Sequence, residues 1–189
     1  MESKVTLFNP RKFILFLLLG SVVMMFAAFT SAYIVRKGEG NWLEFDLPSL
    51  FQWSTVAIVV SSITLLGAQK FNNEGKNKLA LQLTVVTLLL GLAFLALQWG
   101  SWSQIYHYKY PVVFGGKYSN PSGSFLYVIS GLHMAHIIGG VLYLLLACFS
   151  VKNKIQDGSK SERLELSAIF WHFLGGLWLY LYIFLIVNH

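Results

Sequence analysis

The sequence has little charge, one cysteine and no visible internal repeat. Only 12% of its residues are charged, roughly half the share expected of a soluble domain, so a soluble globular fold is excluded. Cys148 is the one cysteine, which excludes a disulfide framework and a cysteine-ligated metal cluster. The lack of an internal repeat weakens the case for a transporter built from inverted repeats.

What the sequence does have is five long runs without Asp, Glu, Lys or Arg. A transmembrane helix needs roughly 20 apolar residues, and the mean hydropathy of the chain is +0.60. We therefore predict an all-α membrane protein, with residues 1–189 forming a single membrane domain. The first run is longer than the roughly 7–15 apolar residues of a signal peptide, so we keep it as a helix. The predicted helices cover residues 13–35, 50–69, 79–99, 125–149 and 166–187.

The basic residues predict how these helices are oriented. Lys and Arg collect on the cytoplasmic side of short loops. Ten of them lie before the first run, between the second and third, or between the fourth and fifth, against four on the other side. We therefore predict a cytoplasmic N-terminus and a periplasmic C-terminus. This asymmetry explains the net charge of +6, for which anionic lipid headgroups are the natural partner; nothing indicates nucleic acid.

Small residues and hydroxyls predict packing faces on the helices. Small residues four apart let helix backbones approach closely in lipid, and the first run has Ala27 with Ser31 and Ala28 with Ala32. The second run has a further set of small and hydroxyl residues, whose hydroxyls can bond within their own helix or across to a neighbouring one: Ala57, Ser61, Ser62 and Thr64. Gly175 and Gly176 serve the last run in the same way. We expect both features to serve helix packing.

Three histidines lie inside apolar runs: His133 and His136 in the fourth and His172 in the fifth. Histidines three apart share one side of a helix, and in a membrane such a pair is a candidate haem or metal site or a proton relay. A transition-metal site usually recruits three or four ligands, yet no run contains a carboxylate. His136 and His172 also differ in expected depth by roughly 10 Å. From the residues alone, a structural hydrogen-bonding role and ligation of haem or metal both stay open.

Two motifs carry a family resemblance. "SGLHMAHIIGG" fits the pattern G-x-H-x-x-H-x-x-x-G, and "FWHFLGGLWLYLY" follows it in the last run. Together with "FDLPSLF" and "SSIT", they resemble subunit III of the haem-copper terminal oxidases, in the five-helix form of the bacterial proteins. The matching residues are Gln98, Gly131, His133, His136, Gly140, Glu165, Trp171, His172, Phe173 and Trp178.

The resemblance implies a non-redox accessory subunit of a respiratory oxidase that reduces oxygen to water and pumps protons. This chain would bind neither haem nor copper, which would lie in subunits I and II. Its bundle would form a V, with helices 1–2 against helices 3–5, packed beside subunit I and holding phospholipid in the cleft. The motif residues would then make structural, subunit or lipid contacts. The expected location is the bacterial inner membrane.

At three positions the chain lacks a carboxylate of the family pattern: Val22, Ser101 and Gly175 stand there instead. The resemblance therefore supports the scaffold role more strongly than a proton-linked one. Two other classes stay open. One is a cytochrome b-type membrane anchor whose histidines bind haem; the other is a small transporter, which the uncharged spans make the weaker rival.

Overall fold

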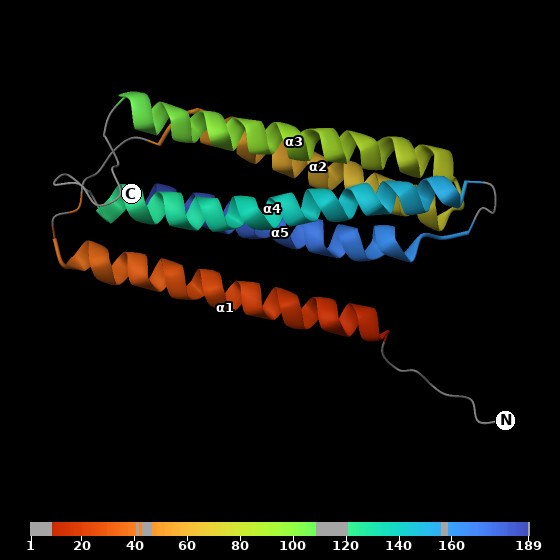
Figure 1. Cartoon of the computed structure of the whole chain (residues 1–189), viewed down its shortest axis with the longest axis horizontal. Coiled ribbons are helices and arrows are strands. Elements are labelled where there is room, and N and C mark those ends of the chain that lie inside the picture. Colours follow the sequence, from red (N-terminus) through yellow and green to blue (C-terminus); the bar gives the residue numbers. More distant parts are fainter. Residues whose placement is uncertain (1–8, 41, 43–46, 109–120, 156–158, 189) are drawn as a thin grey trace.

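The computed structural model describes residues 9–40, 42, 47–108, 121–155 and 159–188. In this part of the chain the regular elements are five α-helices, without a strand (Figure 1). Each helix is long and apolar enough to cross a membrane, which confirms the predicted all-α membrane fold. The helices are α1 (Pro10–Gly38), α2 (Leu50–Asn73), α3 (Asn77–Tyr108), α4 (Pro121–Asn153) and α5 (Glu162–Asn188).

The helices extend beyond the apolar runs that predicted them. α3 continues to Tyr108 rather than ending near residue 99, so His107, expected in a loop, is helical. α4 begins at Pro121, because proline suits the first helical position, where its missing N–H is not needed. The turn between α2 and α3 is short because Gly75 adopts a positive φ of 75°. This lets the N–H of Lys76 bond the Phe71 carbonyl at 2.9 Å, a common way of ending a helix.

Four of the helices form the body of the protein. α2 packs along α3 and α5, and α4 packs between α3 and α5 (Figure 1). The main core cluster, which includes Phe94, Leu144 and Trp171, lies among these four helices. The expected grouping paired helices 1 and 2 against helices 3–5. In the part of the chain that the structure describes, α2 instead packs along α3 and α5, and α1 does not pack along α2.

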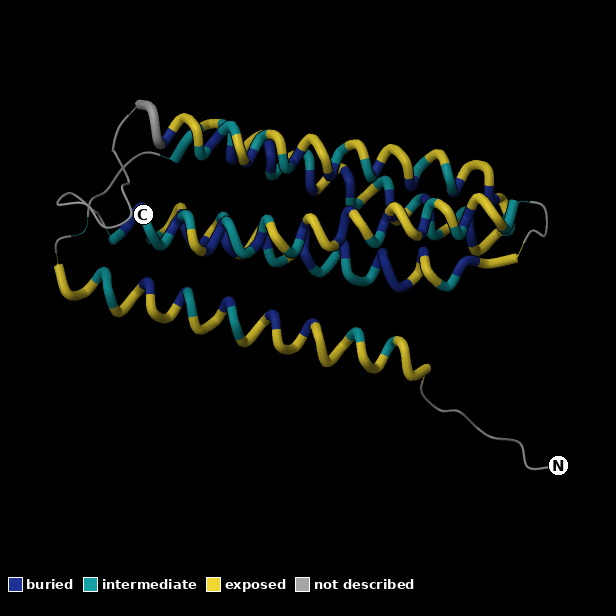
Figure 2. The backbone as a smooth tube through the Cα atoms, viewed as in Figure 1, coloured by how far each residue is buried: buried dark blue, intermediate teal, exposed yellow. Residues whose placement is uncertain are grey.

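α1 lies to one side, along α4 and α5, and is exposed over most of its length (Figures 1 and 2). It buries one narrow face, which includes Val22, Phe26 and Tyr33. These side chains join residues of α4 and α5 in a second core cluster. The four small residues predicted to form a packing face of α1 make no close packing contact within this chain, because all four are exposed in it. Large side chains that reach across to α4 and α5 make the contact instead.

Polar contacts hold α1 at both ends. At its start, Arg11 pairs with Glu162 at 2.8 Å and Lys12 pairs with Glu165 at 2.6 Å. At its end, the Lys37 ammonium donates to the Asn188 carbonyl at 2.6 Å. The side chains between these ends meet α4 and α5 through the narrow apolar face of α1.

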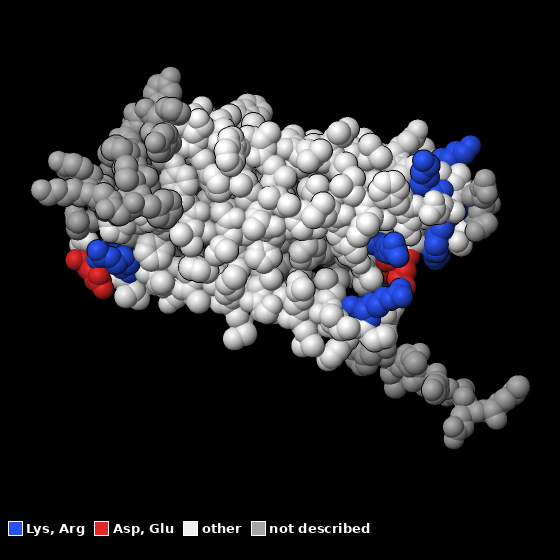
Figure 3. All heavy atoms as spheres, in the orientation of Figure 1, with Lys and Arg blue, Asp and Glu red and all other residues white. Residues whose placement is uncertain are grey.

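Charge is confined to the two ends of the bundle. Figure 3 shows Lys and Arg gathered mainly at the end where α1 and α5 begin, with an uncharged body between the ends. Arg36 and Lys37 lie at the opposite end. Lys4, Lys109 and Lys117 fall outside the described residues. The orientation in the membrane therefore stays a prediction.

Candidate functional site

His133 lies at the centre of a layer of aromatic rings. It is fully buried, and its ring stacks on that of Trp178, with the centroids 5.1 Å apart and the planes at 27°. The rings of Phe94 and Phe26 meet it edge-on at 6.0 and 6.2 Å. Neither ring nitrogen has a hydrogen-bond partner among the described residues. His133 therefore contacts side chains from α1, α3 and α5 from its place on α4.

His136 makes a different contact one turn along α4. Its Nδ1 lies 2.7 Å from the carbonyl of Leu132, a distance at which Nδ1–H donates to that oxygen. Its ring also meets the edge of Phe26, with the centroids 5.9 Å apart. The spacing thus places both histidines toward α1, as two histidines three apart on one helix should lie. Phe26 is the side chain they share.

Trp178 and Gln98 connect this layer to α2. The Trp178 indole N–H donates to Thr55 Oγ1 at 3.0 Å, and its ring stacks on Phe51 at 5.9 Å. Gln98 is almost fully buried and donates through Nε2 to Ser54 Oγ at 3.1 Å. Buried amide and indole groups need such partners. These contacts give two of the predicted residues a defined role in joining helices.

Trp171 occupies a slot between α3 and α4. A Cβ added at Gly91 would lie 2.6 Å from the ring atom Cη2, and one added at Gly140 would lie 3.1 Å from Cε3. Its indole N–H donates to Ser61 Oγ at 2.9 Å, so the prediction that the Ser61 hydroxyl serves helix packing is confirmed. The glycine of the histidine motif, Gly140, is therefore the place where α4 approaches this ring closely.

The remaining motif residues are more dispersed. Gly131 lies beside the ring of Trp102, and Phe173 packs against both core clusters. Glu165 is the partner of Lys12. His172 is half-buried and lines a niche between α2 and α5. The structure thus gathers His133, His136 and Trp178 around Phe26 and Phe94, whereas His172 and Glu165 lie elsewhere.

The surroundings of His133 do not suit an axial ligand of a haem. An axial histidine needs an open approach at a ring nitrogen, but His133 is enclosed by three aromatic rings. His136 donates through Nδ1 to its own helix, which fixes the ring orientation and leaves Nε2 as its free nitrogen. Among the described residues, no three His, Cys, Asp or Glu side chains are close enough together to hold a metal ion.

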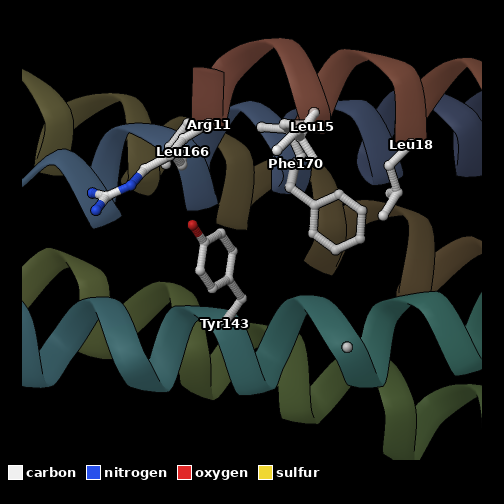
Figure 4. Close-up of a pocket in the computed structure, with 8 residues that line it drawn as sticks. Arg11, Leu15, Leu18, Tyr143, Leu166 and Phe170 are labelled. Atoms are coloured by element: carbon white, nitrogen blue, oxygen red, sulfur yellow. The ribbon is translucent and has the colours of Figure 1, made fainter. Parts of the chain in front are cut away.

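A groove separates the first half of α1 from α4 and α5. It has a volume of about 430 Å³, and its walls are almost entirely apolar. In Figure 4, Tyr143 points from α4 into the groove, with its hydroxyl directed across toward the other helices. The lining residues are Arg11, Ile14, Leu15, Leu18, Gly139, Tyr143, Leu166 and Phe170. The groove combines a long apolar wall with a cationic and a hydroxyl group.

Each of the three positions without the family's carboxylate is closely surrounded. Val22 is 5% exposed and belongs to the second core cluster. Ser101 is fully buried and donates to the Leu97 carbonyl at 2.9 Å. A Cβ at Gly175 would lie 3.1 Å from Ser62 Oγ. The first two positions are filled by neutral side chains, and the third borders the niche that His172 lines.

Sequence reasoning missed two sets of contacts. One is the pairing of Arg11 and Lys12 with the first turn of α5, which an acidic start to α5 opposite a basic start to α1 could have suggested. The other is Asn72, whose side chain accepts from the Ser161 N–H at 3.0 Å and thereby ties α2 to the start of α5. No sequence pattern points to that partner, because 89 positions separate the two residues.

Three known proteins that this chain resembles are each named as subunit 3 of an oxidase. Residues 41–188 match the sequence profile of cytochrome c oxidase subunit III. The chain is 33% identical over 143 residues to cytochrome c oxidase subunit 3 of Cyprinus carpio; the matched segment covers 74% of this chain and 49% of the relative. It is 27% identical over 145 residues to the protein named "Probable cytochrome c oxidase subunit 3" of Rickettsia prowazekii, covering 76% and 48%.

A third relative comes from Staphylococcus saprophyticus and is named "Probable quinol oxidase subunit 3". It is 25% identical over 138 residues, which cover 73% of this chain and 66% of the relative. The chain spans about half the length of the first two relatives. Five membrane-spanning helices and bacterial relatives together support a multi-pass bacterial membrane protein. The match over 41–188 takes in α2 to α5, the helices that carry both motifs, and the chain belongs to the cytochrome c oxidase subunit III family.

Proposed function

We propose that this chain is a non-redox accessory subunit of a haem-copper respiratory oxidase in the bacterial inner membrane. The observation that carries the proposal is the family match over α2 to α5, the helices whose motif residues build the core. The complex would reduce oxygen to water and pump protons, with haem and copper held by subunits I and II. The aromatic enclosure of His133 supports a chain that contributes packing rather than a redox centre.

The second part of the proposal is that the chain packs beside subunit I and holds phospholipid in the groove along α1. The groove has the chemistry that a lipid needs. An acyl chain would lie against Leu15, Leu18 and Phe170, held by van der Waals packing, because the surrounding lipid is as apolar as the groove and transfer from water plays no part. The headgroup phosphate would meet Arg11 and the Tyr143 hydroxyl, since guanidinium groups bind phosphate well.

The packing also weighs against the cytochrome b-type alternative. A haem placed beside His133 would have to displace the rings of Trp178, Phe94 or Phe26, which are fully or almost fully buried. No observation on the described residues favours the transporter class, because the charged residues of the five helices lie only in their first or last turns.

Purification of the tagged chain from membranes in mild detergent tests the proposal. We expect a twelve-helix subunit I and a copper-type subunit II to copurify with it. Stripping this chain from the complex should leave the haem spectrum and the copper content of the remaining subunits unchanged. Loss of haem in proportion to the chain removed would instead identify it as a haem protein. Purification of the chain without oxidase subunits would contradict the proposed membership.

A further inference from the structure

The two halves of α1 are held to the bundle in different ways. From Leu19 to Tyr33 the helix buries a side chain about once per turn. In the stretch from Pro10 to Leu18 no residue is buried, and the groove of about 430 Å³ lies between this stretch and the helices α4 and α5. α1 therefore has an anchored second half and a first half that spans the groove.

Ion pairs hold the start of the first half. Arg11 pairs with Glu162 at 2.8 Å, and Lys12 pairs with Glu165 at 2.6 Å. Asn9 Nδ2 adds a hydrogen bond to Glu162 Oε1 at 2.5 Å. The four paired side chains are between 37% and 68% exposed, and exposed ion pairs bind weakly. We call these two ion pairs the latch. It lies at the end of the groove, and it can break without disturbing either core cluster.

A glycine and a serine mark the point where the two halves meet. Gly20 is exposed, and a Cβ added there would meet nothing within 4 Å, so packing within this chain does not require a glycine. Ser21 Oγ donates to the Leu18 carbonyl at 2.7 Å, a bond that competes with the helical ladder. Glycine weakens a helix interior, and Gly/Ser pairs are common sites of kinks. The helix is thus weakest directly beside Leu19, where the anchored half begins.

We propose that residues 10–18 form a gate, which is hinged at Gly20 and Ser21, closed by the latch, and swings away from α5 when the latch breaks. The anchored half keeps α1 on the bundle while the groove widens. A phospholipid phosphate would compete with Glu162 for Arg11, since a guanidinium binds phosphate as well as carboxylate, and an acyl chain could then enter the groove. This consequence for lipid rests on the proposed function, whereas the movement itself does not.

Distances between spin labels on the full chain test the movement, in nanodiscs of phosphatidylethanolamine and phosphatidylglycerol. Cys148 is first replaced by alanine. Nitroxides at the exposed positions 13 and 82 then report the gate distance, from α1 to α3 on the far side of the bundle (Figure 1). Position 13 lies roughly 10 Å from the hinge at 1.5 Å per residue, so a kink of about 20° moves it by roughly 4 Å. Nitroxides at the exposed positions 35 and 103 report the anchor distance in the second half.

The double variant Glu162→Gln, Glu165→Gln breaks the latch and leaves the basic residues that orient the chain unchanged. We expect a second population whose gate distance is longer by roughly 4 Å, with the anchor distance unchanged. Adding Gly20→Ala and Ser21→Ala stiffens the hinge and should remove that population. Glu74→Gln is the control, because it breaks an ion pair of 2.8 Å in the turn between α2 and α3 and should change neither distance.

An unchanged gate distance in the double variant would overturn the inference. So would an equal change in the anchor distance, because α1 would then leave the bundle as a whole. A phospholipid with a photoreactive acyl chain tests the consequence: labelling of Leu15 and Phe170 should rise in the double variant and fall when the hinge is stiffened, and equal labelling would refute the gate as a route for lipid. Purification of the wild-type chain without oxidase subunits would refute the proposed function and leave the spin-label result standing.

Discussion

The slot that holds Trp171 makes one substitution especially informative. In Gly91→Ala, the new methyl group would lie 2.6 Å from Cη2 of that ring, closer than carbon atoms tolerate, and 3.0 Å from Cζ2, which is a tight contact. The ring has little freedom to withdraw. A Cβ at Gly140, on the opposite helix, would lie 3.1 Å from it, and Ser61 holds its N–H at 2.9 Å.

The expected cost of Gly91→Ala follows from this geometry. Overpacking a core by one methyl group typically costs about 1–3 kcal/mol when neighbours are forced to shift. The folded-to-unfolded ratio should therefore fall by a factor of roughly 5 to 160. Gly139→Ala is the matched control, because that glycine is exposed on α4 with nothing within 4 Å of an added Cβ. We expect Gly139→Ala to gain up to about 1 kcal/mol of stability, because alanine suits a helix interior better than glycine. Gly91→Ala shares that gain, so the difference between the two variants measures the clash.

Unfolding of the detergent-solubilised protein by a graded series of sodium dodecyl sulfate measures both variants. A double-mutant cycle with Trp171→Phe adds a second reading, since the smaller ring should relieve most of the Gly91→Ala clash. The coupling free energy then reports the contact itself. Equal unfolding midpoints for Gly91→Ala and Gly139→Ala would refute the slot, as would a cost that is unchanged in the Trp171→Phe background.

Three further predictions concern the bundle as a whole. A reporter active only in the periplasm should work when fused to the C-terminus and fail at the N-terminus, and the reverse result would overturn the orientation. Dicyclohexylcarbodiimide should leave residues 13–35 unmodified in the wild-type protein but label Val22→Glu. Because Val22 is only 5% exposed, the glutamate would bury an unpaired carboxyl at a cost of several kcal/mol, and less of the subunit should remain in the complex. Asn72→Ala leaves the buried N–H of Ser161 unpaired, at about 1–3 kcal/mol, and should speed tryptic cleavage between α4 and α5; an unchanged cleavage rate would contradict this role.

Much of the fold could be predicted from the sequence because the membrane sets a length for each helix. The five runs were long enough to leave no alternative, and each became a helix. What hydropathy could not reveal is which face of a helix points inward. Lipid-facing and buried residues are both apolar, so the small residues of α1 looked like a packing face although they are exposed. Phe26, which makes part of the contact, is as apolar as the exposed Val23 and Met24 beside it.

The motif residues illustrate the same limit. The pattern with Gly140 and Trp171 is local to two helices, and it correctly drew attention to both residues. Gly91, which forms the other wall of the slot, lies on a third helix and carries no signal of its own. Only the fold shows that one indole ring fixes the spacing of α3, α4 and α5. The roles of the motif residues as subunit or lipid contacts stay predictions, since the contacts seen in this chain are internal.

The surroundings of Val22, Ser101 and Gly175 show what replaces the three missing carboxylates. Val22 extends an apolar cluster between α1, α4 and α5. The hydroxyl of Ser101 is satisfied by its own helix. A Cβ added at Gly175 would lie 3.1 Å from Ser62 Oγ and 3.6 Å from Ile58 Cγ1, so this position is tight as well, although it borders the niche that His172 lines. An acid restored at position 22 or 101 would meet a neutral, closed environment. One restored at position 175 would first have to displace the Ser62 side chain, so each of the three positions is now packed for a neutral residue or for none.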